Sequence, residues 1–277
     1  MLKTIYHRLR SRKKLVESYD LLQKGARLQL KGDQLTCGSE LALLLIHDLE
    51  ADGAEVSELH RVTDMLEAIQ VPYTASSASP EVAEATKIGS AAIRWAKKLG
   101  AEEEGAKMHD TIASLICKCQ GLEGLHAASE HFSRGEDPGA FAKVLADASK
   151  AADSSEKDLL LTRAVLQVLA AGKAENLQER LTFARELMKA YQGLACSSSS
   201  TPQAHFTQLL LQAMEVRSLP LVELLQKEYG RSLERDPELG ELLEAVKHTY
   251  FPSFGGQGMG GILGSLFQRM TTPEMPT

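Results

Sequence analysis

The stretch from Pro80 to Ala151 constrains the fold more than any other part of this chain, because its apolar residues recur at helical spacing. One stripe runs along the first helix of the stretch, at Ile88, Ala92, Trp95 and Leu99, and a second along the next helix, at Met108, Ile112, Leu115, Ile116 and Cys119. Such spacing places the apolar side chains on one side of each helix. Two more helices, about Leu122 to Arg134 and one opening at Asp137-Pro138, make two pairs. Neither pair can bury its stripe alone, so the pattern predicts stacked helix pairs.

The remainder of the chain continues this pattern, and no strand-like alternation of apolar and polar residues occurs in it. A capping residue followed by proline, which favours a helix start, recurs at Ser79-Pro80, Asp137-Pro138, Thr201-Pro202 and Asp236-Pro237. Further helices are predicted at residues 1–11, 14–31, 35–51, 56–69, 159–169 and 177–191, from Pro202, from Pro220 to Gly230, and after Pro237. We therefore expect an all-α protein: an α-solenoid of stacked antiparallel helix pairs, a right-handed superhelix like that of tetratricopeptide repeats, although no repeat signature at a period of 34 is found.

Three regions are expected: an N-terminal helical half at 1–150, a C-terminal helical half at 151–250, and a tail at 251–277 that differs in composition. The tail has six glycines and a short amphipathic segment with Ile262, Leu263, Leu266 and Phe267. One interpretation is a frayed terminus. The other is a strap that docks on a groove, because an isolated apolar cluster costs solubility unless it is covered.

Charge is distributed unevenly along the chain. Residues 1–31 carry nine Lys and Arg against two acids, a net charge of +7, whereas the whole chain carries −6, so the remainder carries −13. Basic residues at one end of an acidic body form either an ordinary solvated face or a docking surface for an acidic partner.

The sequence indicates a cytosolic protein with reduced thiols. Its four cysteines resemble no disulfide framework, and no secretory segment follows the N-terminus. The longest apolar run, Leu41 to Ile46, is far shorter than the roughly 20 residues that cross a bilayer. The basic, acid-free residues 1–14 also fit an organellar transit peptide, but the pattern continues into a helical pair.

No pattern for catalysis, a metal or a cofactor is found. The glycines at 255–264 follow no strand and precede no Lys-Ser/Thr pair, so they indicate a linker rather than a phosphate-binding loop. Cys117 and Cys119 point about 200° apart on a helix and cannot share one ion, and Cys119 falls on the apolar stripe. The eight histidines are scattered, and no nucleophile elbow occurs. The chain is therefore expected to be a non-catalytic scaffold that binds other proteins.

Several segments in order resemble one known family. The central ones are Ala92-Ile93-Arg94-Trp95, Met108 to Ala113, and Ala127 through His131-Phe132; the outer ones are Gly25-Ala26, Cys37 to Leu41, Arg163 to Gln167, Tyr229 through Asp236-Pro237, and Gly260 to Leu266. Together, in this order and over nearly the full chain, they resemble the Golgi-to-ER traffic protein four family, the scaffold subunit of the guided-entry pathway for tail-anchored membrane proteins.

The resemblance implies a cytosolic adaptor with two binding ends, for insertion of tail-anchored proteins into the ER. The N-terminal half would hold the targeting ATPase, and the C-terminal half the ubiquitin-like guided-entry subunit five, whose co-chaperone partner carries the substrate. Nucleic acid, membrane insertion and cofactors are not implied. On the ATPase face, Arg8 matches a basic position and Glu40 an acidic one, while Arg12 lies beside Ser11, a position that is basic in part of the family. Ile262, Leu263, Leu266 and Phe267 would bind the ubiquitin-like subunit or dock the tail.

Two other protein classes stay open. A helical-repeat subunit of the proteasome or signalosome type would share the solenoid but should end in a winged-helix module, and no strand-rich segment follows Pro237. An RNA-binding helical repeat would use the basic N-terminus together with base-stacking aromatic residues, for which Tyr6 and Tyr19 are the available candidates.

Overall fold

Four helices begin at the proline dipeptides named above, and in each the residue before the proline caps the helix with its side chain. Such caps satisfy backbone N–H groups that have no partner inside the helix. The bonds run from Val82 N–H to Ser79 Oγ (3.4 Å), Ala140 N–H to Asp137 Oδ1 (2.8 Å), Ala204 N–H to Thr201 Oγ1 (3.2 Å) and Glu238 N–H to Asp236 Oδ1 (3.1 Å). The four predicted helix starts are confirmed.

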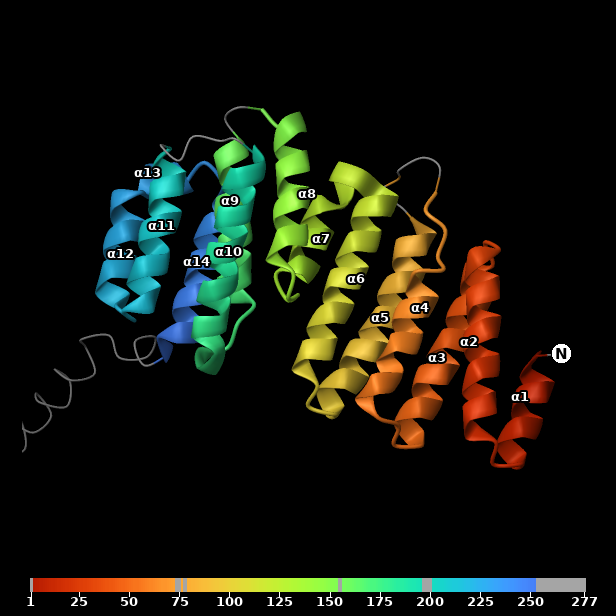
Figure 1. Ribbon diagram of the computed structural model, residues 1–277. Helices are drawn as coiled ribbons and strands as arrows, with labels where there is room; N and C mark the ends of the chain where they lie inside the picture. The colour runs from red at the N-terminus through yellow and green to blue at the C-terminus, as the bar shows by residue number, and fades with distance from the viewer. Residues whose placement is uncertain (1, 73–75, 77–78, 154–155, 196–200, 253–277) are drawn as a thin grey trace, which may run out of the picture. The chain divides into compact units, whose positions relative to one another are not determined.

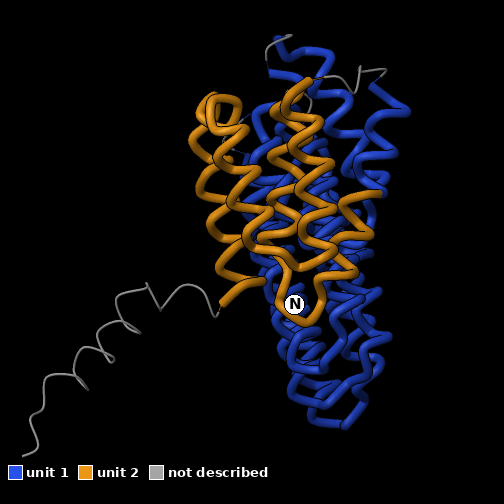
Figure 2. The backbone as a smooth tube through the Cα atoms, turned by 90° about the vertical axis from the view of Figure 1, so that its left-hand side faces the viewer, with its two compact units in different colours: residues 1–157, 186–197 blue, residues 158–185, 198–277 orange. Residues whose placement is uncertain are grey.

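The computed structural model describes residues 2–72, 76, 79–153, 156–195 and 201–252, and over those residues it contains helices and no strand (Figure 1). The chain divides into two compact units, residues 1–157 with 186–197 and residues 158–185 with 198–277, which Figure 2 colours separately. The prediction of an all-α helical-repeat protein is confirmed. The division into binding ends at residues 150 and 250 concerns partners and stays a prediction.

In the first unit α1 packs on α2, α2 on α3, α3 on α5, α5 on α6, α6 on α7 and α7 on α8, while α4 packs on α2 and α5. Their bounds are α1 Leu2–Ser11, α2 Leu15–Lys31, α3 Leu35–Ala51, η1 Val56–Leu59, α4 His60–Leu66, α5 Pro80–Lys98, α6 Glu102–Gln120, η2 Gly121–Gly124, α7 Leu125–Phe132 and α8 Pro138–Ala151. The later part of α10 (Leu177–Ala195) also belongs to this unit.

The two stripes predicted at 80–151 form part of the core of the first unit. Trp95 is 1% exposed, and Ile88, Ile112 and Cys119 are buried as expected. Helices α5 and α6 approach closely at Gly89, where a Cβ atom would lie 2.4 Å from Ile112 Cδ1. This glycine therefore allows the side chain of Ile112 to fill the space between the two helices.

Several details of the prediction are wrong. Leu99, assigned to the stripe, is 45% exposed because α5 ends at Lys98 and Leu99 begins the turn. Some helix bounds also differ: the predicted helices at 122–134 and 56–69 each open with a 3-10 turn and end earlier, and Gly230 begins the short α13 instead of ending a helix.

The second unit is organised around α9, which is buried on nearly all sides as predicted. It contains α9 (Lys157–Ala170), η3 (Ala174–Asn176), the first part of α10, α11 (Pro202–Glu215), α12 (Leu219–Glu228), α13 (Gly230–Leu233) and α14 (Pro237–Tyr250). At the end of α14 the buried Tyr250 hydroxyl donates to the Leu169 carbonyl (2.9 Å). A Cβ atom on Gly172 would lie 2.1 Å from that hydroxyl, so only glycine leaves room for it.

Helices α6 and α7 bring together two half-buried histidines, and this contact predicts a pH dependence of stability. The Nδ1 atoms of His109 and His131 lie 2.9 Å apart. Burial, the charge of His131 and that of Arg134 lower the pKa of His109 to about 4, and burial and Arg134 also lower the pKa of His131. Both rings are therefore held neutral in the folded protein.

We expect the free energy of unfolding to rise by about 2 kcal/mol between pH 4 and pH 6.5 through this pair. The unfolded rings take up protons below their ordinary pKa near 6.5, so stability is complete above that pH and is lost as the pH falls. Asp110 changes the free energy of unfolding in the opposite direction: burial raises its pKa to about 6, so its contribution to stability falls as the pH rises. Urea unfolding at each pH measures the free energy of unfolding of wild type and of the double variant His109→Gln/His131→Gln. The difference between the two values gives the contribution of the histidine pair. Parallel pH profiles would contradict the prediction.

Candidate functional site

Helix α1 is held on α3 by a polar cluster of four side chains, which fixes the part of the chain that carries the predicted basic face. The Tyr6 hydroxyl donates to Asp48 Oδ2 (2.7 Å). Arg10 binds both carboxylate oxygens of Asp52, with Nη2 donating to Oδ1 at 3.0 Å, and its Nε lies 3.7 Å from Asp48 Oδ2. These contacts join residues about 42 positions apart in sequence, so they are tertiary contacts that orient the whole of α1.

A fifth side chain, from α2, completes the cluster. The Tyr19 hydroxyl donates to Asp52 Oδ2 (2.6 Å). The bonds from Arg10 and Tyr19 hold the pKa of Asp52 below its usual value. Burial and the bonds to the aspartates raise the pKa values of Tyr6 and Tyr19 to about 12. The cluster thus keeps the charges of Arg10 and Asp52 and the protons of both tyrosines at physiological pH.

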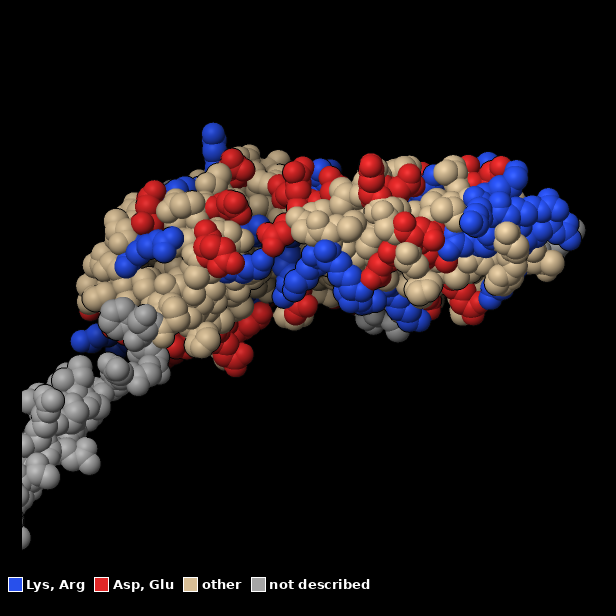
Figure 3. Space-filling model, turned by 90° about the horizontal axis from the view of Figure 1, so that it is seen from below, with Lys and Arg blue, Asp and Glu red and all other residues tan. Residues whose placement is uncertain are grey.

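The opposite side of α1 carries Arg8, and Arg12 follows one turn later. With about 100° per residue, Arg8 lies about 140° around the helix from Lys3, while Arg10 lies within about 20° of Lys3, on the side that contacts α3. Arg8 and Arg12 are exposed, and within the described residues neither has a side-chain ion pair. Ile5, one turn before Arg8, is 42% exposed. Figure 3 shows Lys and Arg side chains gathered at the α1 end of the first unit. We call Ile5, Arg8 and Arg12 the α1 outer face.

Glu40 is placed differently from the two arginines. It lies on α3 and its Oε2 is 3.1 Å from Lys3 Nζ, with both side chains about 60% exposed. Because Lys3 belongs to the α3 side of α1, the structure brings Arg8 and Arg12 together but leaves Glu40 on a neighbouring surface.

The positioning residues Arg10, Asp48 and Asp52 were not predicted as site residues, and Tyr6 was named only as a candidate for stacking on a base. A signal was present in their spacing: Tyr6 and Arg10 are four residues apart on α1, as are Asp48 on α3 and Asp52, which caps the end of that helix. Such pairs share a helix face. Two carboxylates on a largely apolar helix indicate polar partners, because an unpaired buried charge is costly.

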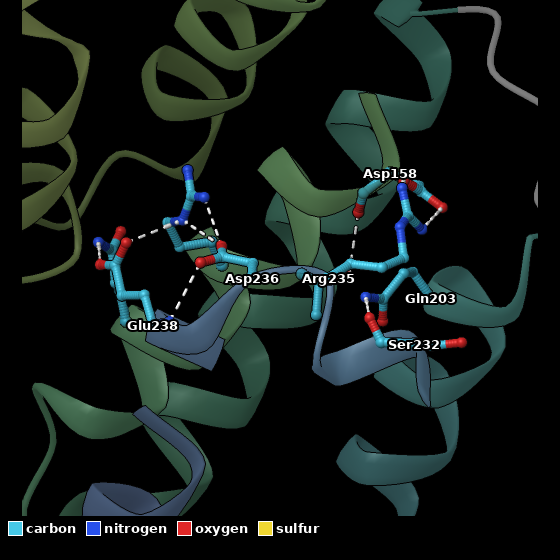
Figure 4. Close-up of polar contacts among 9 residues, drawn as sticks. Asp158, Gln203, Ser232, Arg235, Asp236 and Glu238 are labelled. Atoms are coloured by element: carbon cyan, nitrogen blue, oxygen red, sulfur yellow. Dashed lines mark hydrogen bonds and ion pairs between the residues drawn. The ribbon is translucent and has the colours of Figure 1, made fainter. Parts of the chain in front are cut away.

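The second unit holds a second polar cluster, at the junction of α13 and α14 (Figure 4). Arg163 on α9 binds Asp236 through Nε (3.0 Å) and Nη2, and its Nε is 3.0 Å from Glu238 Oε2. Arg235 binds both carboxylate oxygens of Asp158 (3.1 Å each). Both ion pairs fix the start of α14 on α9.

Helices α11 and α12 expose more apolar surface than the sequence pattern indicated. Leu221 and Leu224, three residues apart on one side of α12, are 45% and 51% exposed. Leu209 on α11 and Val216 just after it are 38% and 65% exposed. We call these four side chains the α11–α12 apolar surface. Their exposure could not be read from spacing, because apolar periodicity does not distinguish a covered face from an uncovered one. The predicted docking residues Ile262, Leu263, Leu266 and Phe267 lie outside the described residues.

In the described part of the chain no three His, Cys, Asp or Glu side chains are grouped to hold a metal ion. Across the same residues, no helix combines the length and apolarity that crossing a membrane requires. The predicted aromatic residues of an RNA site, Tyr6 and Tyr19, are both buried with their hydroxyls bonded to aspartates, so neither is available to stack on a base.

Comparison with known proteins identifies the family. The Golgi to ER traffic protein 4 homolog of Dictyostelium discoideum is 27% identical over 95% of this chain and 81% of its own length, and Protein GET4 of Arabidopsis thaliana is 25% identical over 98% and 89%. The Homo sapiens homolog is 25% identical over 96% and 79%. A structure described as the crystal structure of C. therm. Get4 is similar in fold, with a TM-score of 0.68 at 20% identity, covering 99% of this chain and 91% of that one.

The sequence profile of the family described as Golgi to ER traffic protein 4 matches residues 12–267. That range includes every segment that carries the resemblance and both helical units except α1. The chain therefore belongs to the Golgi to ER traffic protein 4 family.

Proposed function

We propose that this protein is a non-catalytic cytosolic adaptor for the post-translational insertion of tail-anchored membrane proteins into the ER. Its N-terminal end would hold the targeting ATPase, and its C-terminal end the ubiquitin-like subunit five of the guided-entry pathway, whose co-chaperone partner carries the substrate. Tethering donor and acceptor to one scaffold raises their effective concentration, so transfer needs no catalytic group on this chain. Family membership supports a role in membrane traffic.

The observation that carries the proposal is the α1 outer face. Arg8 projects from α1, and Arg12 follows directly after Ser11, the last residue of that helix. The contacts of Arg10 with Asp48 and Asp52 fix the orientation of α1, so Arg10 holds the helix in place while Arg8 and Arg12 stay exposed. Two exposed cations on a rigid element suit an acidic surface on the ATPase. Such complementarity mainly speeds encounter and fixes the docking register.

The C-terminal end of the adaptor is assigned to the α11–α12 apolar surface. Exposed leucines on one side of a helix are typical of a surface that a partner covers. The tail residues Ile262, Leu263, Leu266 and Phe267 stay candidates for binding the same partner. The capture experiment below distinguishes binding by the tail from binding by the α11–α12 apolar surface.

We expect Arg8→Glu/Arg12→Glu to slow association with the purified nucleotide-loaded ATPase about tenfold at low salt and to flatten its salt dependence. Stopped-flow or biolayer measurements of the association rate between 20 and 300 mM salt test this. The matched control is Lys24→Glu/Arg27→Glu, which makes the same change in net charge with exposed residues of α2. If both double variants associate equally slowly, only general attraction is at work and the α1 outer face is not the docking site.

The same assay tests bridging when the ubiquitin-like subunit is immobilised first. Leu221→Glu/Leu224→Glu should abolish capture of this chain by that subunit and leave its binding to the free ATPase unchanged. A chain ending at residue 252 keeps the α11–α12 apolar surface and should still be captured. Loss of capture by the truncated chain, with full capture of the leucine variant, would assign the subunit to the tail instead.

A further inference from the structure

The first unit contains a groove of about 510 Å³ that the adaptor function described above does not use. It lies among the end of α4, the residues that follow it, the middle of α6 and the start of α8. Its volume falls in the range of roughly 300–1,000 Å³ that is usual for ligand sites. The groove is large enough for a few side chains of a peptide segment.

One part of the groove lining is apolar. Leu66, Ile69 and Leu115 contribute to it although each is almost fully buried, and Val71, which also lines it, is 46% exposed. Leu66 and Ile69 come from α4 and the turn after it, whereas Leu115 comes from α6. Val71 therefore offers most of the accessible apolar surface, and the three buried side chains lie next to it in the lining.

The other part of the lining carries an excess of negative charge. Glu67, Asp110 and Asp137 line the groove together with one cation, Lys118. Nearby exposed carboxylates are paired, as Glu103 and Glu104 are with Lys107, but within the described residues none of the three groove carboxylates has an ion pair. The groove therefore combines apolar surface with an excess of negative charge.

The hydrogen bonding and the pKa of Asp110 agree with an excess of negative charge in the groove. Its Oδ2 accepts the N–H groups of Glu136 (2.8 Å) and Asp137 (3.1 Å), and its buried Oδ1 has no hydrogen-bond partner among the described residues. Burial, with smaller contributions from the charges of Asp137 and Glu136, raises its pKa to about 6, although the two backbone hydrogen bonds act in the opposite direction. Burial and the carboxylates of Glu103, Glu104 and Asp137 also raise the pKa of Glu136. A bound cation would relieve this repulsion.

We propose that the groove among α4, α6 and α8 binds a peptide segment of a partner protein that presents an arginine or lysine side chain next to an apolar one. The cation would lie against the carboxylates of Glu67 and Asp137, and the apolar side chain against Ile69, Val71 and Leu115. Ser114, which lies between Asp110 and Leu115 in the sequence of α6, also lines the groove and offers a hydroxyl group. The segment is recognised by charge and shape together, so neither alone should suffice.

Fluorescence anisotropy at 150 mM salt tests this with three labelled peptides: Leu-Arg-Ala-Leu-Leu-Arg-Ala, its counterpart with both arginines replaced by citrulline, and its counterpart with both replaced by glutamate. We expect saturable binding of the arginine peptide, at least fivefold weaker binding of the citrulline peptide and none of the glutamate peptide. Equal binding of the arginine and citrulline peptides, or no saturable binding of the arginine peptide, overturns the proposal.

Three variants locate the binding. Ser114→Trp fills the groove without changing charge and should weaken binding at least tenfold, and Glu67→Lys should weaken it about fivefold. Glu179→Lys, an exposed position of the second unit, makes the same charge change and should have no effect. Thermal unfolding shows whether Ser114→Trp remains folded, and Glu67→Lys provides the test if it does not. If Glu179→Lys weakens binding as much as Glu67→Lys does, the peptide is held only by general electrostatic attraction, and the proposal is overturned.

Discussion

Trp95→Ala is expected to lower the free energy of unfolding by about 3–5 kcal/mol, which is the usual cost of truncating a large aromatic side chain in a core. Trp95 is 1% exposed and lies on the stripe by which α5 packs in the first unit. Its removal leaves a cavity that neighbouring helices can close only partly, because α5 and α6 already touch at Gly89 and Ile112. Urea unfolding followed by far-ultraviolet circular dichroism measures the loss.

The matched control for this prediction lies four residues further along. Leu99 continues the same apolar spacing but is 45% exposed, so Leu99→Ala should cost less than about 1 kcal/mol. The pair of variants separates burial from sequence spacing. A loss below about 1 kcal/mol for Trp95→Ala would show that the packing of α5 is described wrongly.

Asp236→Ala should lower the free energy of unfolding by about 2–3 kcal/mol, since this side chain has two functions in the second unit. It caps α14 by accepting the N–H of Glu238, and loss of such a cap costs about 1 kcal/mol. It also pairs with Arg163, whose side chain is 30% exposed against 11% for Asp236. Solvent around Arg163 reduces the cost of leaving it unpaired below that of a fully buried pair.

Asp236→Asn distinguishes the two functions, because asparagine caps a helix about as well as aspartate but carries no charge. The asparagine variant should lower the free energy of unfolding by about half as much as the alanine variant does. Glu234→Ala, an exposed position in the same turn, is the control and should change stability by less than about 0.5 kcal/mol. If the asparagine and alanine variants are equally unstable, the ion pair provides the whole effect; if neither differs from wild type, the cluster in Figure 4 does not fix α14.

The helices were predictable where their signals are local. A capping residue before proline determines a start whatever surrounds it, and the spacing around Trp95 and Ile112 identifies a buried side because the pattern continues over several turns. Bounds were less predictable at Leu99 and Gly230, since a turn is decided by backbone contacts that spacing does not encode. Leu221 and Leu224 show a further limit: they share one side of α12 and are exposed, because only tertiary packing decides whether an apolar face is covered.

The candidate sites were predictable to a smaller extent for the same reason. Arg8 and Arg12 were identified through the family resemblance, and their exposure agrees with a docking role, which remains a proposal. The anchoring contacts of Arg10 with Asp52 join distant segments and needed the fold. Glu40 could not be separated from the two arginines on sequence alone, because its surface is determined by how α3 lies against α1.

The hydrogen bond from the Tyr250 hydroxyl to the Leu169 carbonyl indicates where the chain can be truncated or joined to another domain. It is the last side-chain contact described before the tail, and it connects the end of α14 to the end of α9. A chain shortened to residue 248 would lose this tie and free the last turn of α14, whereas one ending at residue 252 would retain it. Reporter domains and affinity tags are therefore best joined after residue 252, and Gly172 is a position to leave unchanged in any redesign, because an added methyl group there would displace the Tyr250 hydroxyl.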